Sequence, residues 1–448
     1  MKLWETSDSL SSDKLVEQFT ASEDVLLDEQ LWAYDILGSL AHSEMLYQIG
    51  ILSRPERDQV CVALSALMNE EVHVTPADED IHTKLENMLV ELIGDAGKKI
   101  HTARSRNDQV LVALRLYTKV WLLEIADLLL ALAKECAQFA KRNEGQPMPG
   151  YTHTRAAMLS SVGLWASSLS ECLLDDLDLL EAAYALVDQN PLGAAAGYGV
   201  PLAIDRELTT QLLGFARTQN NTLAVMNSRG KHEFAVLSAL SCILLDLNRF
   251  ASDLILFSAG EYGFFELPPE YCTGSSIMPH KRNPDVLELL RARSARVLSM
   301  LTQQAIILKG LTSGYHRDLQ ETKRPLFDAL STTHASLQIL TPLIAGLRVN
   351  KKNLDSAITP ELFAVDEVLE RVQAGVALRD AYRQVKERLN QLKRRDSVKA
   401  LKARSHAGGP GNLRLPELDQ KIAFLQNLWS KRRQGFDEAQ TRLLRLGT

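Results

Sequence analysis

Cysteine is scarce in this sequence, and its spacing fits neither a disulfide framework nor structural zinc. The 448 residues contain five cysteines, an odd number, and no Cys-x-x-Cys pair. This usage argues against a disulfide-stapled secreted protein and against a zinc ribbon. It fits a reducing compartment, so we expect a cytoplasmic protein. The ten histidines are dispersed, and the sequence therefore predicts no metal site.

The chain also lacks an excess of charge and the common nucleotide-binding loops. Charged residues make up 24%, and the net charge is −6. Without a basic surplus, we expect no nucleic-acid partner and no anionic membrane partner. The first residues hold no apolar core of signal-peptide type, and the longest largely apolar run, 234–245, is too short to span a bilayer. No Gly-x-x-x-x-Gly-Lys-Ser/Thr or Gly-x-Gly-x-x-Gly motif occurs, so no nucleotide cofactor is predicted.

Glycine and proline are sparse, and the gaps between them outline the architecture. Residues 108–144 contain neither, and apolar residues recur there three or four apart. A helix of that length would run about 50 Å. Residues 164–190, 231–259 and 285–309 are similar stretches. Strand alternation is scarce, so the sequence predicts an all-α fold built on a long helical bundle.

The length allows two or three domains. Breaks are suggested near residues 94–99 and around 350–360, where Thr359-Pro360-Glu361 is typical of a helix start. We predict an N-terminal helical domain at 1–106, a central bundle at 107–355 and a small C-terminal domain of shorter helices at 356–448. Wide apolar arcs at 234–237 and 254–257 would leave apolar surface exposed on a single bundle, so we expect subunits to associate through the central helices.

The most informative segment is residues 273–284, Thr-Gly-Ser-Ser-Ile-Met-Pro-His-Lys-Arg-Asn-Pro. A flexible Gly-Ser-Ser stretch precedes a predicted helix start, with Asn283 as the N-cap and Pro284 in the first helical position. Lys281 and two adjacent hydroxyls could bind a carboxylate and bring a base to a neighbouring carbon. The alternative is a polar loop with a solvated Lys-Arg pair. The segment resembles the signature loop of the fumarase/aspartase superfamily, whose members eliminate fumarate from succinyl compounds.

Four further polar clusters lie far apart in the sequence, at residues 80–83, 101–108, 150–155 and 315–323. Taken singly, each is typical of a helix cap or a solvated turn. Together with the loop at 273–284, they supply donors suited to several carboxylates and one guanidinium. Residues 101–109, His-Thr-Ala-Arg-Ser-Arg-Asn-Asp-Gln, narrow the resemblance to the argininosuccinate lyase family, in which the third residue is usually glycine.

The resemblance continues through residues 19–22, 149–153, 318–321 and 379–382, and so covers nearly the whole chain. It implies a three-domain all-α fold of the fumarase/aspartase type. It also implies a homotetramer in which each active site draws on three subunits. The implied reaction is the reversible elimination of fumarate from argininosuccinate to give arginine, a step of arginine biosynthesis that uses no cofactor and no metal.

The resemblance also implies roles for individual residues. Ser275 matches the family's catalytic serine, which we assign as the base that removes the carbon-bound proton. His153 matches the histidine on the other side of the substrate, which could protonate the leaving nitrogen. The reverse assignment of these two roles stays open. Glu288 matches a partner of the histidine, and Lys281 and Asn283 match groups that stabilise the carbanion's charge.

Further positions fall on the family's substrate contacts: Ser22, Arg106, Asn107, Thr152, Asn283, Tyr315, Gln320 and Lys323. Of these, Arg106 and Lys323 are suited to carboxylates. Asp80 and His82 lie on a family segment near the site, and purely structural hydrogen bonding is an equal alternative for both.

The chain departs from the family pattern at some positions. Arg155 stands where glutamine is usual, Ala103 replaces glycine, and Ala194 replaces a common serine. The triplet at 280–282 is closer to the adenylosuccinate lyase version of the loop, so that activity is the alternative within the superfamily. A non-catalytic relative, like the lens crystallins derived from this lyase, is the alternative of another class.

Overall fold

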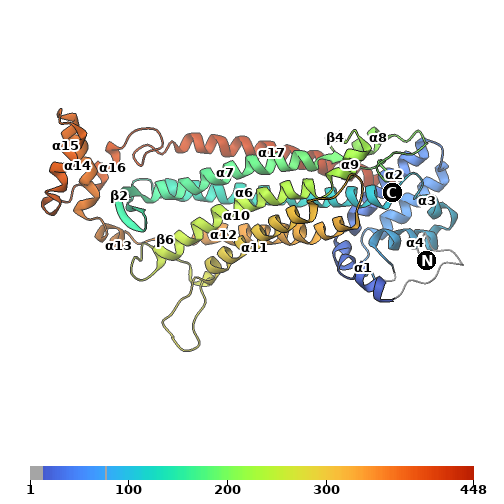
Figure 1. Ribbon diagram of the computed structural model, residues 1–448, viewed down its shortest axis with the longest axis horizontal. Helices are drawn as coiled ribbons and strands as arrows, with labels where there is room; N and C mark the ends of the chain where they lie inside the picture. The colour runs from blue at the N-terminus through green and yellow to red at the C-terminus, as the bar shows by residue number, and fades with distance from the viewer. Residues whose placement is uncertain (1–13, 76–77, 448) are drawn as a thin grey trace.

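The protein is an elongated bundle of long helices (Figure 1), described by a computed structural model for residues 14–75 and 78–447. The N-terminal helices lie at one end of the bundle, and the short helices that follow α12 lie at the other. In the described residues, strands form only three two-stranded sheets. The predicted all-α fold with a long central bundle is confirmed.

Five long helices make up the centre of the bundle. They are α6 (Arg106–Arg142), α7 (Val162–Val187), α10 (Lys231–Ser258), α11 (Asp285–Leu308) and α12 (Lys323–Gly346). The first four match the stretches predicted from the gaps in glycine and proline to within three residues. The fifth was missed, because Pro325 and Pro342 lie inside it.

The N-terminal elements pack around the start of α6. They are α1 (Lys14–Asp28), η1 (Glu29–Leu31), α2 (Trp32–Gln48), α3 (Arg54–Leu67), α4 (Ile81–Ile93) and α5 (Asp95–Lys98). A capping box fixes the first turn of α6, since Asp108 accepts the Ser105 N–H at 2.9 Å. The second Asp108 oxygen accepts the N–H groups of Gly193 and Ala195, both at 2.9 Å. Burial raises the pKa of this carboxyl to about 6.

A β-hairpin lies at the opposite end of the bundle, formed by β1 (Pro147–Thr152) and β2 (Arg155–Ser161). The other short elements join the central helices. They are β3 (Gln189–Asn190), α8 (Arg206–Leu212), β4 (Arg217–Thr218), α9 (Thr222–Ser228), β5 (Phe265–Glu266), η2 (Pro269–Tyr271), η3 (Arg317–Thr322) and β6 (Arg348–Val349). Strand β3 pairs with β4, and β5 pairs with β6.

The C-terminal part leaves the bundle and then returns along it (Figure 1). The elements beyond the bundle are α13 (Lys351–Ser356), η4 (Pro360–Phe363), α14 (Ala364–Gln373), α15 (Leu378–Lys386), η5 (Leu389–Gln391) and α16 (Ser397–Ala403). The predicted helix start at Thr359 is confirmed, because Thr359 is the N-cap of η4.

The last long helix, α17 (Leu415–Leu444), ends in η6 (Arg445–Gly447) and packs against α6 and α7. The expectation that the C-terminal part holds only shorter helices is therefore wrong. Buried residues Leu418, Ile422, Leu425 and Trp429 recur three or four apart, but Pro416 and Gly435 lie inside α17 and interrupt the gap in glycine and proline. The division of the chain into domains at residues 106 and 355 stays a prediction. Residues 415–447 pack with the bundle and with α3.

Helix α10 is the core helix of the bundle. Within the described ranges it is the one helix long and apolar enough, by length and composition, to cross a membrane. The apolar run at 234–245 is shorter than a span, but the helix around it has 28 residues. In its most apolar window 56% of the residues are buried, and α10 packs against α7, α11 and α12. Its apolar character is accounted for by burial between helices.

Candidate functional site

The predicted site residues fall into two sets at opposite ends of the bundle (Figure 1). The α6-start set comprises Arg106, Asn107, Tyr315, Gln320 and Lys323, together with Ser22 on α1. The hairpin–loop set comprises Thr152, His153, Ser275, Lys281, Asn283 and Glu288. Helix α6 has 37 residues and therefore runs about 55 Å between the two ends. One chain does not bring the two sets together.

Arg106 is held by carboxylates of its own chain. Its Nε lies 3.2 Å from Asp80, and its Nη1 lies 3.1 Å from Glu86. Its Nη2 donates to Thr83 at 3.1 Å. Burial acts to lower the pKa of Arg106, but Asp80 and Glu86 outweigh it and raise the pKa above the ordinary value. The guanidinium fork expected to bind a substrate carboxylate is thus engaged within the chain.

Asp80 and His82 have structural roles. Asp80 caps α4 by accepting the Thr83 N–H at 2.7 Å, and it also pairs with Arg106. His82 is fully buried, with its Nδ1 3.0 Å from Asp35. Burial acts to lower the pKa of His82, but the Asp35 carboxylate raises it. Of the two readings for these residues, the geometry favours structural hydrogen bonding and ion pairing.

Lys323 is buried between two carboxylates that the sequence analysis did not single out. Its Nζ lies 2.5 Å from Asp24 and 2.5 Å from Asp28, both on α1. Burial acts to lower the pKa of Lys323, but Asp28 and Asp24 outweigh it and raise the pKa. Two carboxylates hold one ammonium here, so Lys323 does not present a free cation.

The remaining members of the α6-start set lie on α1, at the start of α6 and in or beside η3. Gln320 donates to the Thr20 carbonyl at 3.0 Å and so fixes α1 two residues before Ser22. The side chain of Ser22 lies outside what the structure describes. Tyr315 is 37% exposed, and its ring faces the guanidinium of Arg229 at 5.1 Å. Among the described residues, the Asn107 side chain makes no hydrogen bond, so its amide is free for a ligand.

The hairpin presents His153 at its tip. Thr152 pairs with Arg155, which leaves His153 and Thr154 as a two-residue turn with φ values of 53° and 57°. Two left-handed residues define a type I′ turn, which usually takes Asn or Gly. Holding a β-branched threonine there costs backbone strain, and such strain is concentrated at functional sites. Thr152 and His153 are both exposed.

The loop that carries Ser275 is closed by two backbone hydrogen bonds between Thr273 and Asn283, at 3.1 and 2.8 Å. The prediction that Asn283 caps the helix is wrong. Helix α11 begins at Asp285 with Pro284 in the cap position, and the Asn283 amide instead donates to the Gly274 carbonyl at 3.3 Å. The loop's paired ends leave no room for Asn283 to serve as the cap.

Ser275 lies in a local electrostatic environment suited to negative charge. Its Oγ accepts the N–H groups of Ile277 at 3.4 Å and Met278 at 3.1 Å. Donors aimed at an oxygen favour its deprotonated form. Lys281 and Glu288 are exposed in this chain. Within the described part of the chain, no hydrogen bond or ion pair joins His153 to Ser275, Lys281 or Glu288.

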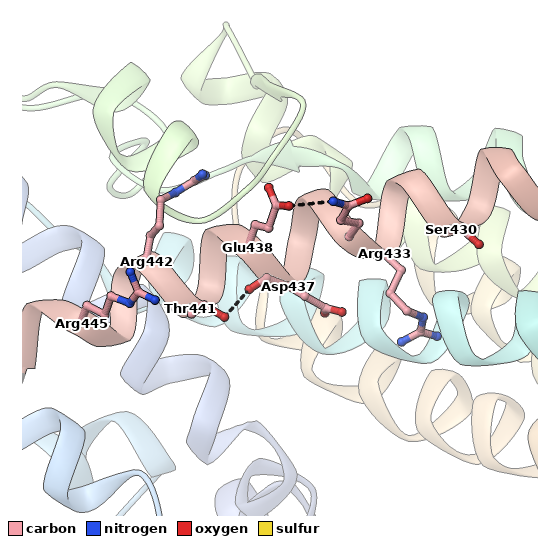
Figure 2. Close-up of a pocket in the computed structure, with 8 residues that line it drawn as sticks. Ser430, Arg433, Asp437, Glu438, Thr441, Arg442 and Arg445 are labelled. Atoms are coloured by element: carbon pink, nitrogen blue, oxygen red, sulfur yellow. Dashed lines mark hydrogen bonds between the residues drawn. The ribbon is translucent and has the colours of Figure 1, made fainter.

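One of two surface hollows is lined by a predicted site residue. A cavity of about 630 Å³ lies beside the hairpin, between Thr152 and the side chains of Leu369 and Glu370 on α14. An open groove of about 590 Å³ follows one face of α17 (Figure 2). There Gln434 donates to Glu438 at 2.9 Å, one turn along the helix. No predicted site residue lines this groove, and its pairs are those of a solvated helix face.

Comparison with known proteins matches this arrangement to one family. A family model described as Lyase matches residues 8–299. The chain is 46% identical to the argininosuccinate lyase of Thermotoga neapolitana over 396 residues, which cover 88% of this chain and 99% of that protein. It is 44% identical to the argininosuccinate lyase of Sorangium cellulosum over 426 residues, or 94% and 98% of the two chains. This chain belongs to the argininosuccinate lyase family.

Membership in the argininosuccinate lyase family makes the chain a lyase, as the sequence predicted. The fold agrees with a solved structure of EDDS lyase, with a TM-score of 0.82 over 98% of this chain and 96% of that one. The sequence identity is 22%, so this likeness supports the fold alone. The two relatives named above match 88% and 94% of this chain.

Ala103 shows why the argininosuccinate lyase segment usually has glycine at this position. Its φ of 64° lies in the left-handed region, which costs a non-glycine residue roughly 1–2 kcal/mol. Glycine would relieve this strain. Its greater conformational freedom in the unfolded chain would lower the free energy of unfolding by about 0.4–1 kcal/mol and so offset part of the gain. The segment 101–105 leads directly into the first turn of α6, so the strain is next to Arg106 and Asn107.

We predict that Ala103→Gly raises the free energy of unfolding by about 0.5–1 kcal/mol, measured by urea denaturation. Ala131→Gly, at an exposed position inside α6, is the matched control and should lower it by about 1 kcal/mol. Equal destabilisation by both substitutions would contradict the strain at Ala103.

Proposed function

We propose that the protein catalyses the reversible elimination of fumarate from argininosuccinate, releasing arginine as a step of arginine biosynthesis. The observation that carries this proposal is 44–46% identity to argininosuccinate lyases over most of the chain. The hallmark segment at 101–109 and the loop at 273–284 lie within the matched region. Their side chains supply the groups that the reaction needs.

Ser275 acts as the base in this proposal. It takes the proton from the carbon beside a succinyl carboxylate, and the electron pair spreads onto that carboxylate. The two backbone N–H groups at its Oγ stabilise the serine alkoxide that accepts this proton. Lys281 and the Asn283 amide, on the same loop, would stabilise the carbanion's carboxylate. The carbon–nitrogen bond then breaks, and fumarate forms.

His153 acts as the acid that gives a proton to the leaving guanidinium nitrogen, directly or through water. Its place at the tip of a strained turn fixes its backbone and leaves the imidazole free to enter a site. Glu288 would fix the tautomer of the His153 imidazole once another subunit brings these two side chains together. Thr152 precedes His153 and would contact the substrate beside it. The reverse assignment of base and acid to Ser275 and His153 stays open.

The α6-start set would bind the parts of the substrate that lie away from the bond that breaks. Asn107 offers a free amide, and Arg106 shapes the first turn of α6 through its carboxylate partners. The negative corner of Asp24, Asp28 and Lys323 suits a cationic group of the arginine portion. Gln320 would contribute from η3, where its amide contacts the Thr20 carbonyl, and Tyr315 from beside Arg229; Ser22 would contribute from α1.

The separation of the two sets supports a homotetramer with shared sites. Since about 55 Å of helix lies between them in one chain, a complete site needs His153 and Ser275 from subunits other than the one that supplies Asn107. Apolar side chains on the central helices support such assembly: Leu245, Leu289 and Ile306 are 46%, 57% and 68% exposed. Burying them between subunits would be favourable.

A cytoplasmic location belongs to the same proposal. All five cysteines are free thiols, which fits a reducing compartment. Arginine biosynthesis from a small charged substrate fits the same location.

The first test is a substrate assay. We expect purified protein to release fumarate from argininosuccinate, followed by its absorbance, without added metal or nucleotide. Adenylosuccinate should give no signal. Turnover of adenylosuccinate with argininosuccinate inert would replace the assignment, and turnover of neither would favour a non-catalytic relative.

We predict that Ser275→Ala lowers kcat by about 10²–10⁴-fold, because it removes the proposed base. Its thermal unfolding should be unchanged, since Ser275 is on an exposed loop. Ser276→Ala, the adjacent hydroxyl, is the matched control and should have a much smaller effect. A Ser275→Ala enzyme with wild-type kcat would refute the assignment.

Mixing two inactive variants tests the shared sites. His153→Asn and Ser275→Ala subunits, dissociated and reassociated together, should restore about a quarter of the sites, because each site then draws its two groups from different subunits at random. Each variant treated alone is the control. Mixed oligomers without recovered activity would show that both groups act from one subunit.

A further inference from the structure

A cavity beside η3 is lined by the buried guanidinium of Arg229, from which no described residue accepts a hydrogen bond. The cavity measures about 340 Å³ and lies between α9, the end of α11 and the Thr312–Gly314 turn. Arg229 is only 5% exposed, and its Nε is buried without a partner. Across the described residues, no side chain or carbonyl accepts a hydrogen bond from this guanidinium. Buried arginines are normally paired with carboxylates, because an unpaired buried charge is costly.

The backbone around Arg229 is tightly built. Gly230 starts α10 with a φ of 80°, and its carbonyl accepts the Gln304 amide at 3.0 Å. A Cβ at this position would sit 2.3 Å from Leu308 Cδ2, so only glycine fits. The Tyr315 ring covers the guanidinium at 5.1 Å, a cation–π contact. Arg229 is thereby fixed with its donors beside the cavity.

The acidic groups near Arg229 do not satisfy its donors. Asp24 and Glu233 attract it electrostatically, but neither accepts a hydrogen bond from it. The Asp24 carboxylate is bonded to Lys323, as described above. Lys231, the second cation lining the cavity, is exposed. Planar, bidentate recognition by arginine fits a carboxylate better than other small anions of one charge.

We propose that Arg229 binds the α-carboxylate of the arginine portion of the substrate. This inference rests on the proposed function, in which Tyr315, Gln320 and Lys323 hold that portion. Tyr315, one of the predicted substrate contacts, has its ring over Arg229. A guanidinium that no described residue pairs, within electrostatic reach of the Asp24 carboxylate, matches the paired charges of an α-amino acid head, with its carboxylate on Arg229 and its ammonium toward Asp24. None of the family's motifs described above includes Arg229.

The test compares arginine with agmatine, which has the same guanidinium and chain but no carboxylate. For the wild type we expect arginine to inhibit the forward reaction more strongly than agmatine. Arg229→Gln should weaken inhibition by arginine about 10- to 100-fold and leave agmatine unchanged, because one charge-assisted carboxylate contact is lost. Arg229→Lys should weaken inhibition by arginine to a smaller extent. The KM for fumarate in the reverse reaction should not change.

Lys309→Gln removes an exposed charge one residue beyond α11 and is the matched control, with inhibition by arginine unchanged. The proposal is overturned if Arg229→Gln weakens arginine and agmatine equally, or if it leaves the preference for arginine intact. If Arg229→Gln fails to fold, the ratio of inhibition by arginine to inhibition by agmatine is measured for Arg229→Lys, and the same outcomes apply. A wild type inert toward argininosuccinate would contradict the proposed function. Calorimetric binding of arginine but not agmatine, lost on Arg229 substitution, would still support a carboxylate site.

Discussion

The length and stiffness of α6 constrain everything else in this structure. Its 37 residues contain neither glycine nor proline, and buried apolar side chains hold it against α7, α12 and α17. The capping box and the Asp108 contacts to Gly193 and Ala195 fix where it begins. Because this rod separates Asn107 from the hairpin that carries His153, chemistry that uses both must draw on more than one chain. The proposed oligomer would then take part in catalysis as well as in stability.

The two ends of the bundle differ in how their charges are held. At the α6 start, the cations are paired within the chain: Arg106 with Asp80 and Glu86, and Lys323 with Asp24 and Asp28. At the other end His153, Lys281 and Glu288 are exposed. The first arrangement suits rigid recognition of a ligand, and the second suits groups that enter a site from neighbouring subunits. Arg229 is an exception at the first end, a buried cation whose donors are still available.

Most of the fold could be predicted from local signals, and the site partners could not. Gaps in glycine and proline located four central helices, but α12 contains two prolines, and α17 contains Pro416 and Gly435. The hairpin was missed because its turn uses His153 and Thr154 in place of Asn or Gly. The motifs named the site residues through a family resemblance. No local pattern shows that Lys323 meets Asp28 from 295 residues away, or that Asn283 is held by loop closure.

The central claim is that a complete active site exists only between subunits. The most direct measurement follows specific activity and molecular mass together as the wild-type enzyme is diluted or exposed to mild denaturant that leaves its helical circular dichroism intact. The account predicts that activity falls in parallel with the tetramer fraction and that folded monomers are inactive. Folded monomers that keep the kcat of the tetramer would contradict it.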